Sequence, residues 1–78
     1  MPTGLPLHKT SEIYQRLGER IRQFRLSARL SQIQLASLTG LGHDAVSKIE
    51  LGRSRVELMV IVKLAEILHT DVESLLKA

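Results

Sequence analysis

The sequence predicts a compact all-α domain built from five short helices. Apolar residues recur at steps of three or four, which is the helical period, and no stretch alternates in the way a strand does. The chain has 78 residues, a length that suits one hydrophobic core. We expect residues 1–10 to form a flexible tail and residues 11–78 to form the single folded domain.

The first helix is expected to begin near Thr10 and Ser11, since both residue types are good N-caps. Its apolar stripe runs over about four turns and comprises Ile13, Leu17, Ile21, Phe24 and Ala28. Gly18 lies inside this helix, where glycine costs stability. Its presence suggests that another backbone approaches closely there.

Two short helices follow, separated by a turn. Ser31 is the expected cap of a helix over about residues 32–38, and residues 39–42 (TGLG) interrupt it. A third helix is expected over about residues 43–51, and Gly52 ends it as a left-handed C-terminal glycine does.

The last two helices are predicted from apolar spacing after a loop over residues 53–56. The fourth is marked by Leu58, Ile61, Leu64, Ala65 and Leu68. Asp71 is the candidate cap of the fifth helix. The apolar side of that helix comprises Val72, Leu75 and Leu76.

Composition excludes several classes of function. The chain has no cysteine, which rules out disulfides and thiolate metal sites. His8 and His69 stand in separate segments, so no metal site or cofactor is expected. Paired carboxylates and a glycine-rich phosphate loop are also missing, so we expect no catalytic residues and no enzyme activity. No apolar run is long enough to span a membrane, and we expect a cytoplasmic protein.

Charge is distributed unevenly along the chain. Residues 1–56 carry a net charge of +5 and residues 57–78 a net charge of −2. The excess of basic residues in the first 56 positions suggests a surface that faces a polyanion. The only aromatic residues are Tyr14 and Phe24, too few for a platform that stacks single-stranded bases.

Residues 32–51 have the pattern of two helices that cross through a tight turn. Ala36 is the fifth residue of this unit, where the helices nearly touch, and Gly40 is the ninth, where the turn needs a positive φ. Val46 and Ile49 lie three residues apart and are expected to pin the second helix of the unit from behind. The opposite face then presents polar side chains suited to reading base edges, namely His43, Asp44, Ser47 and Lys48.

Over residues 17–76 the chain resembles the lambda-repressor-like, Cro/Xre-type helix-turn-helix domains. The matching stretches are LGERIRQFR, LSQIQLASLTG, AVSKIELG and LMVIVKLAEIL. The resemblance implies a sequence-specific, double-stranded DNA-binding transcriptional regulator, expected to be a repressor that acts as a homodimer on a palindromic operator. An antitoxin-like module that binds a partner protein as well as its operator is the alternative.

The resemblance also implies roles for individual residues. Base contacts are expected from His43, Asp44, Ser47 and Lys48, and backbone contacts from Arg25, Ser31, Gln32, Arg53 and Arg55. For Asp44 two roles stay open: accepting from a cytosine amino group, or favouring the positive end of the helix dipole. Glu50 matches the partner of Arg25 in a pair that joins the first helix to the third. Gly42, Leu51 and Val56 depart from the residues common in the family.

The C-terminal part of the chain is the expected dimer surface. Its apolar side chains exceed what a monomer tail needs, and the residues assigned to the interface are Leu68, Val72, Leu75 and Leu76. The operator sequence stays open, as does the choice between activation and repression. The system that the regulator serves is also open: phage, restriction–modification or toxin–antitoxin control.

Overall fold

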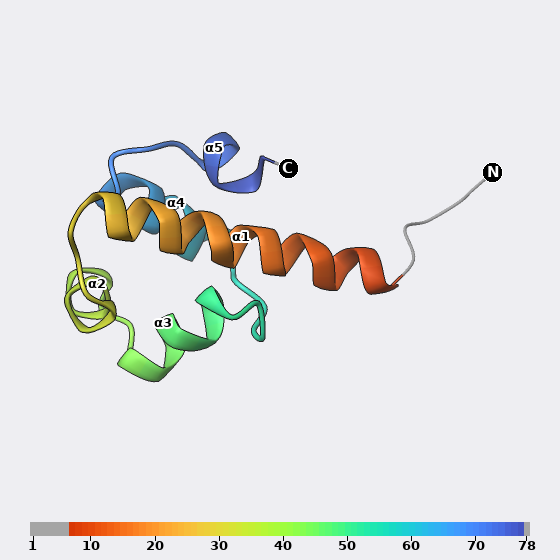
Figure 1. Ribbon diagram of the computed structural model, residues 1–78, viewed down its shortest axis with the longest axis horizontal. Coiled ribbons are helices and arrows are strands. Elements are labelled where there is room, and N and C mark those ends of the chain that lie inside the picture. The colour runs from red at the N-terminus through yellow and green to blue at the C-terminus, as the bar shows by residue number, and fades with distance from the viewer. Residues whose placement is uncertain (1–6, 78) are drawn as a thin grey trace.

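The computed structural model describes the backbone of residues 7–77 and the side chains of residues 12–77. Within this range the chain forms five helices and no strand, which confirms the predicted all-α class (Figure 1). The helices are α1 (Leu7–Ser27), α2 (Gln32–Thr39), α3 (His43–Glu50), α4 (Leu58–Ile67) and α5 (Val72–Leu76).

Helix α1 begins earlier than the sequence predicted. Residues 1–6 of the expected tail lie outside the described residues, but residues 7–10 are helical, so Thr10 and Ser11 lie within α1 and do not cap it. No proline or glycine occurs between Leu7 and Leu17. Nothing in this stretch therefore prevents the helix from extending past the expected caps.

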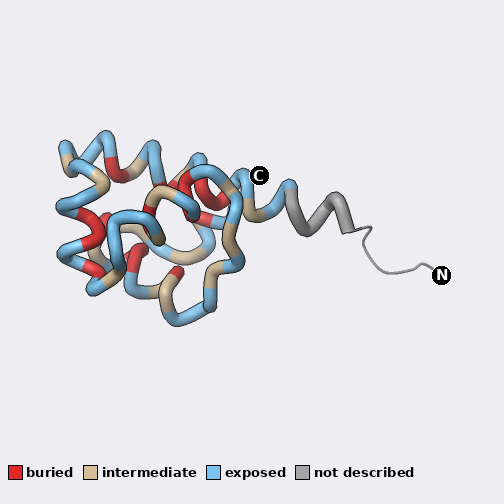
Figure 2. The backbone as a smooth tube through the Cα atoms, turned by 90° about the horizontal axis from the view of Figure 1, so that it is seen from below, coloured by how far each residue is buried: buried red, intermediate tan, exposed pale blue. Residues whose placement is uncertain are grey.

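Helix α1 is the longest of the five helices in residues 7–77. It packs against α3 and α5, while α4 packs against α2 and α5. In Figure 1, α2 and α3 lie on one side of α1, and α5 lies on the other. The buried segments gather on the inner sides of the helices (Figure 2). The core comprises Leu17, Ile21, Leu35, Ala36, Val46, Ile49, Ile61, Leu64, Ala65, Leu68 and Leu75.

Some residues of the predicted apolar stripes are exposed. Ile13 belongs to the N-terminal part of α1, which projects beyond the other helices (Figure 1), and 46% of its surface is exposed. Ala28 follows the end of α1 and is also exposed. Leu58 opens α4 but is likewise exposed, so the apolar face of that helix effectively starts at Ile61.

Local chemistry explains where the helices begin and end. The Ser31 hydroxyl accepts a hydrogen bond from the Gln34 backbone N–H at 3.0 Å, and the Gln34 side-chain oxygen accepts one from the Ser31 N–H at 2.8 Å. This capping box satisfies two donors at the start of α2. At the start of α5, Asp71 accepts from the Ser74 N–H at 2.7 Å. His69, with φ 56°, ends α4 in a left-handed conformation.

None of the helices in residues 7–77 combines the length and the hydrophobicity needed to cross a bilayer.

Candidate nucleic-acid interface

The turn between α2 and α3 is tightly fixed. Gly40 adopts φ 75°, and its N–H donates to the carbonyl of Ala36. Thr39, which the sequence analysis did not single out, is buried, and its hydroxyl donates to the carbonyl oxygens of Leu35 at 2.9 Å and Ala36 at 3.1 Å. Ala36 itself is only 4% exposed, as the close approach of the two helices requires. These contacts set the crossing of α2 and α3.

Two kinds of contact hold the inner side of α3: its buried apolar side chains pack into the core, and its backbone carbonyls lie against α1. Val46 and Ile49 are 1% and 6% exposed. A Cβ atom placed on Gly18 would lie 2.7 Å from the carbonyl oxygen of Glu50 and closer still to that of Ile49. Because real Cβ atoms do not approach backbone so closely, glycine is needed where α1 meets the end of α3. The suggestion that another backbone passes Gly18 is confirmed.

The other side of α3 is polar and faces solvent. His43, Asp44 and Lys48 are exposed, and Ser47 is half-buried. Gly42 precedes the helix in extended conformation and offers no side-chain cap. Asp44 lies in the first turn, where a carboxylate is favoured by the helix dipole. The structure thus brings the four candidate base-reading residues together on one short helix.

A buried ion pair joins α1 to the end of α3. Arg25 donates from Nε to Glu50 Oε2 at 2.6 Å and from Nη2 to Glu50 Oε1 at 2.9 Å. Its Nη1 donates to the carbonyl of Leu30 at 2.8 Å. The two side chains are 9% and 3% exposed. The hydrogen bonds to Glu50 raise the pKa of Arg25, so the guanidinium stays charged.

The buried position of Arg25 in this ion pair does not favour the phosphate contact expected of it. Each of its three nitrogens already donates within the protein, and little of the side chain is exposed. The pair instead fixes the position of Glu50 beneath the start of α2. The contact between Arg25 and a phosphate stays a prediction.

Gln32, the first residue of α2, turns its side chain towards α3. Its Nε2 donates to Glu50 Oε1 at 3.1 Å, and its Oε1 lies 3.2 Å from His43 Nε2. The family resemblance implies a phosphate contact for Gln32, and these two side-chain contacts are not apparent from the sequence. Gln32 and His43 lie eleven positions apart in the sequence, and no periodic pattern links them. Only the crossing of α2 and α3 brings them within hydrogen-bond distance.

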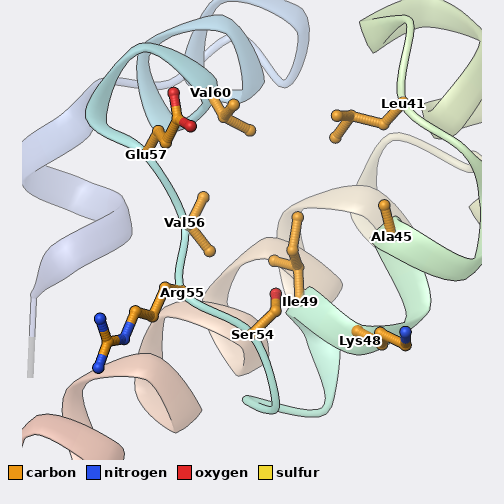
Figure 3. Close-up of a pocket in the computed structure, with 9 residues that line it drawn as sticks. All are labelled: Leu41, Ala45, Lys48, Ile49, Ser54, Arg55, Val56, Glu57 and Val60. Atoms are coloured by element: carbon orange, nitrogen blue, oxygen red, sulfur yellow. The ribbon is translucent and has the colours of Figure 1, made fainter.

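The loop after α3 carries Arg53 and Arg55, which are both exposed. Beside it, a hollow of about 410 Å³ lies between α3 and the start of α4. Figure 3 shows that Leu41, Ile49 and Val60 point towards this space, whereas Lys48 and Arg55 extend away from one another. The hollow is thus lined by apolar side chains together with the charged Lys48, Arg55 and Glu57, and its two cations do not converge on a single anion within it.

The four residues of the predicted dimer surface differ in how far a single chain buries them, and the interface itself stays a prediction. Leu68 and Leu75 are 5% and 0% exposed within one chain, because they fill the core between α1, α4 and α5. Val72 is half-buried against the same core. Of the four residues assigned to the interface, only Leu76 is largely exposed, at 46%.

Comparison with known proteins places the domain among regulators. A family model described as a helix-turn-helix domain matches residues 16–77. The chain is 35% identical over 65 residues to the control protein C.SmaI of Serratia marcescens, covering 83% of this chain and 77% of that protein. It is 33% identical over 60 residues to the SPbeta prophage-derived HTH-type transcriptional regulator YonR of Bacillus subtilis, covering 77% of this chain and 56% of the relative.

A solved structure agrees with these matches. The crystal structure of the restriction-modification controller protein C.AhdI from Aeromonas hydrophila superimposes with a TM-score of 0.76 and 37% identity. The match covers 80% of this chain and 94% of that one. The resemblance stated from the residues is confirmed, and the chain belongs to the Cro/Xre-type helix-turn-helix family.

Proposed function

We propose that the protein is a transcriptional regulator that binds double-stranded DNA sequence-specifically, with α3 in the major groove. One observation carries this proposal: α3 has a polar, exposed face backed by the buried residues Val46 and Ile49. Side chains that donate and accept hydrogen bonds on a rigid helix suit the edges of base pairs. The similarity to control proteins and an HTH-type regulator supports the same role.

The cations near α3 divide naturally into two roles. Lys48 lies on the exposed face of the helix, where an ammonium suits guanine O6 and N7. Arg53 and Arg55 lie on the loop that follows, beside the groove-facing helix, and suit phosphates. The base contacts of His43, Asp44 and Ser47 and the phosphate contact of Ser31 belong to the same proposal. The phosphate contact expected of Gln32 stays a prediction, because the Gln32 side chain already lies against Glu50 and His43.

The regulator acts as a homodimer on a palindromic operator, and its role is that of a repressor. A single chain offers one short reading helix and few phosphate contacts, so two copies on half-sites about 34 Å apart give the required affinity. The resemblance to a restriction-modification controller favours this form of control, and the resemblance to a prophage-derived regulator keeps phage control as the alternative. The alternative of an antitoxin-like partner stays a prediction.

Selection of bound duplexes from a random pool, followed by sequencing, tests the proposal. We expect an enriched palindromic sequence whose affinity falls steeply with salt, because each neutralised phosphate releases about 0.9 counterion. Failure to enrich any sequence, or binding that does not depend on salt, would contradict it.

Two variants separate base reading from phosphate contact. Lys48→Ala is expected to relax preference at one or two base pairs, at a cost of about 1–3 kcal/mol on the operator alone. Arg55→Ala is expected to weaken binding to operator and random duplexes by the same factor. Equal losses on both duplexes for Lys48→Ala would place that residue on the backbone instead.

A further inference from the structure

A continuous chain of hydrogen bonds runs from the buried ion pair to the exposed start of α3. Arg25 donates to Glu50, Gln32 Nε2 donates to Glu50 Oε1 at 3.1 Å, and Gln32 Oε1 lies 3.2 Å from His43 Nε2. The first member is nearly fully buried, whereas His43 faces solvent. The core is thereby connected to a candidate base-reading side chain.

Chemistry fixes the direction of each hydrogen bond in this chain. The Glu50 carboxylate is ionised because it pairs with Arg25, and an ionised carboxylate only accepts. The amide group of Gln32 must therefore turn its NH2 towards Glu50 and its oxygen towards His43. Since an amide oxygen also only accepts, His43 Nε2 must carry the hydrogen.

The neutral imidazole then has one arrangement. With the hydrogen on Nε2, the second ring nitrogen, Nδ1, carries a lone pair and accepts hydrogen bonds. Because His43 is exposed at the start of α3, this ring stands where the proposed function places the edges of the bases. The ring therefore offers the major groove an acceptor, with its donor already used by Gln32.

We propose that Gln32 and Glu50 set the tautomer of His43, so that His43 recognises an exocyclic amino group, adenine N6 or cytosine N4, by accepting a hydrogen bond. This inference rests on the proposed binding to duplex DNA. Gln32 and Glu50 are positioning residues, and His43 is the side chain that touches the base. A freely rotating neutral histidine could equally donate to guanine N7 or O6.

Duplexes with single functional groups removed give the direct test. The position that His43 reads is first identified as the base pair at which His43→Phe loses preference. At that position, purine replaces adenine, or pyrimidin-2-one replaces cytosine, so that only the amino group is lost. The wild-type protein is expected to bind the altered duplex about three- to tenfold more weakly, the range for one neutral hydrogen bond, whereas His43→Phe should not discriminate.

Replacing the purine N7 of the same base pair with a carbon, through 7-deazaadenine in an adenine–thymine pair or 7-deazaguanine in a guanine–cytosine pair, provides the opposing case. The proposal expects no change in the affinity of the wild-type protein. A loss of affinity with the 7-deazapurine, or equal binding with and without the amino group, would overturn it. So would a His43→Phe variant that keeps all base preferences.

Gln32→Met tests the positioning role. Methionine has a similar length but neither donor nor acceptor of matching strength, so the ratio of affinities for intact and amino-free duplexes should fall towards one. A phosphate contact made by Gln32 would weaken both duplexes equally and leave this ratio unchanged. Gln23→Met, on an exposed position of α1, is the matched control and should keep the wild-type ratio.

Nitrogen-15 chemical shifts of the His43 ring give a readout in the absence of DNA. In mildly alkaline buffer, the hydrogen is expected on Nε2 of the wild-type protein, and Gln32→Met should shift the population towards Nδ1. A hydrogen on Nδ1 in the wild type would overturn the inference.

The failure of this inference can be told apart from the failure of the proposed function. If selection enriches no duplex, the proposed function itself fails. If selection enriches a duplex and removal of the amino group has no effect on its affinity, only the role of His43 fails.

Discussion

Gly18 shows how one hydrogen atom in place of a side chain determines the packing of two helices. The backbone carbonyls of Ile49 and Glu50 occupy the space that a Cβ atom at this position would need. Backbone atoms cannot move aside as the end of a flexible side chain does. Any larger residue at position 18 must therefore push α3 away from α1.

We expect Gly18→Ala to destabilise the fold by about 2 kcal/mol, because an overpacking cost of about 3 kcal/mol against rigid backbone outweighs the roughly 1 kcal/mol that alanine gains in helix propensity. Urea denaturation monitored by circular dichroism measures the loss. Gly42→Ala is the control, since a Cβ there meets no atom within 4 Å and φ is −74°. Equal stability of Gly18→Ala and the wild type would contradict the contact.

The pair Arg25–Glu50 is expected to behave as a buried charge pair. Arg25→Met leaves the carboxylate of Glu50 without its partner and should cost about 3–5 kcal/mol, a serious loss for a small domain. The double variant Arg25→Met/Glu50→Leu should recover most of this loss, because no uncompensated charge remains. Equilibrium unfolding of both variants checks the prediction, and a single variant as stable as the wild type would contradict it.

Helix α5 depends on its cap because it has only five residues. The Asp71 carboxylate accepts from the backbone N–H and the hydroxyl of Ser74, and these hydrogen bonds lower its pKa below the ordinary 3.8. A carboxyl whose pKa is lowered in the folded state stabilises the fold above its unfolded pKa, and this contribution disappears as pH falls through the folded pKa.

Asp71→Asn isolates this effect, since asparagine also caps helices but does not titrate in this range. The melting temperature of the wild type relative to Asp71→Asn is expected to fall as the pH decreases below 3.8. Melting curves of both proteins from neutral to acid pH provide the measurement. A difference in melting temperature that does not depend on pH would show that the Asp71 charge contributes nothing.

The five helices could be predicted because apolar residues at steps of three or four must share a buried face. The start of α1 could not be predicted from candidate caps alone, since Thr10 and Ser11 are compatible with a helix interior. Leu38 and Leu58 show the opposite limit. Both are leucines within predicted helices, yet they are 54% and 64% exposed, because spacing does not reveal where the neighbouring helices end.

At the scale of the whole domain, an apolar residue of a helix can belong either to the core or to an interface. Leu75 is fully buried in one chain, whereas its neighbour Leu76 is 46% exposed. Sequence spacing could not separate the two residues, because α5 makes little more than one turn. The packing of α5 against α1 and α4 assigns Leu75 to the core.

We therefore expect Leu75→Ala and Leu76→Lys to have different effects. Leu75→Ala should lower the free energy of unfolding by about 2–5 kcal/mol, the cost of a core cavity. Leu76→Lys should leave folding intact but shift the proposed dimer towards monomers in sedimentation experiments. Leu38→Lys, at an exposed leucine on α2, is the matched control. An unchanged dimer in Leu76→Lys would remove α5 from the interface.

The candidate interface was predictable where it follows helix geometry and not where it follows side-chain contacts. The exposure of His43, Asp44 and Lys48 follows from burying Val46 and Ile49 on the same helix. The hydrogen bonds of Gln32 depend on side-chain rotamers and on how two helices cross. Neither quantity can be obtained from a periodic pattern.

The packing of α3 against α1 at Gly18 has a consequence for how this regulator could come to recognise a new DNA sequence. Because main-chain atoms and two buried aliphatic residues hold α3 in place, its solvent-facing positions are free to vary without disturbing the scaffold. Replacing the residues at those few positions with the ones of another regulator should give this protein the DNA-sequence preference of that regulator. The DNA sequence that the protein recognises can thus change during evolution while the fold stays the same.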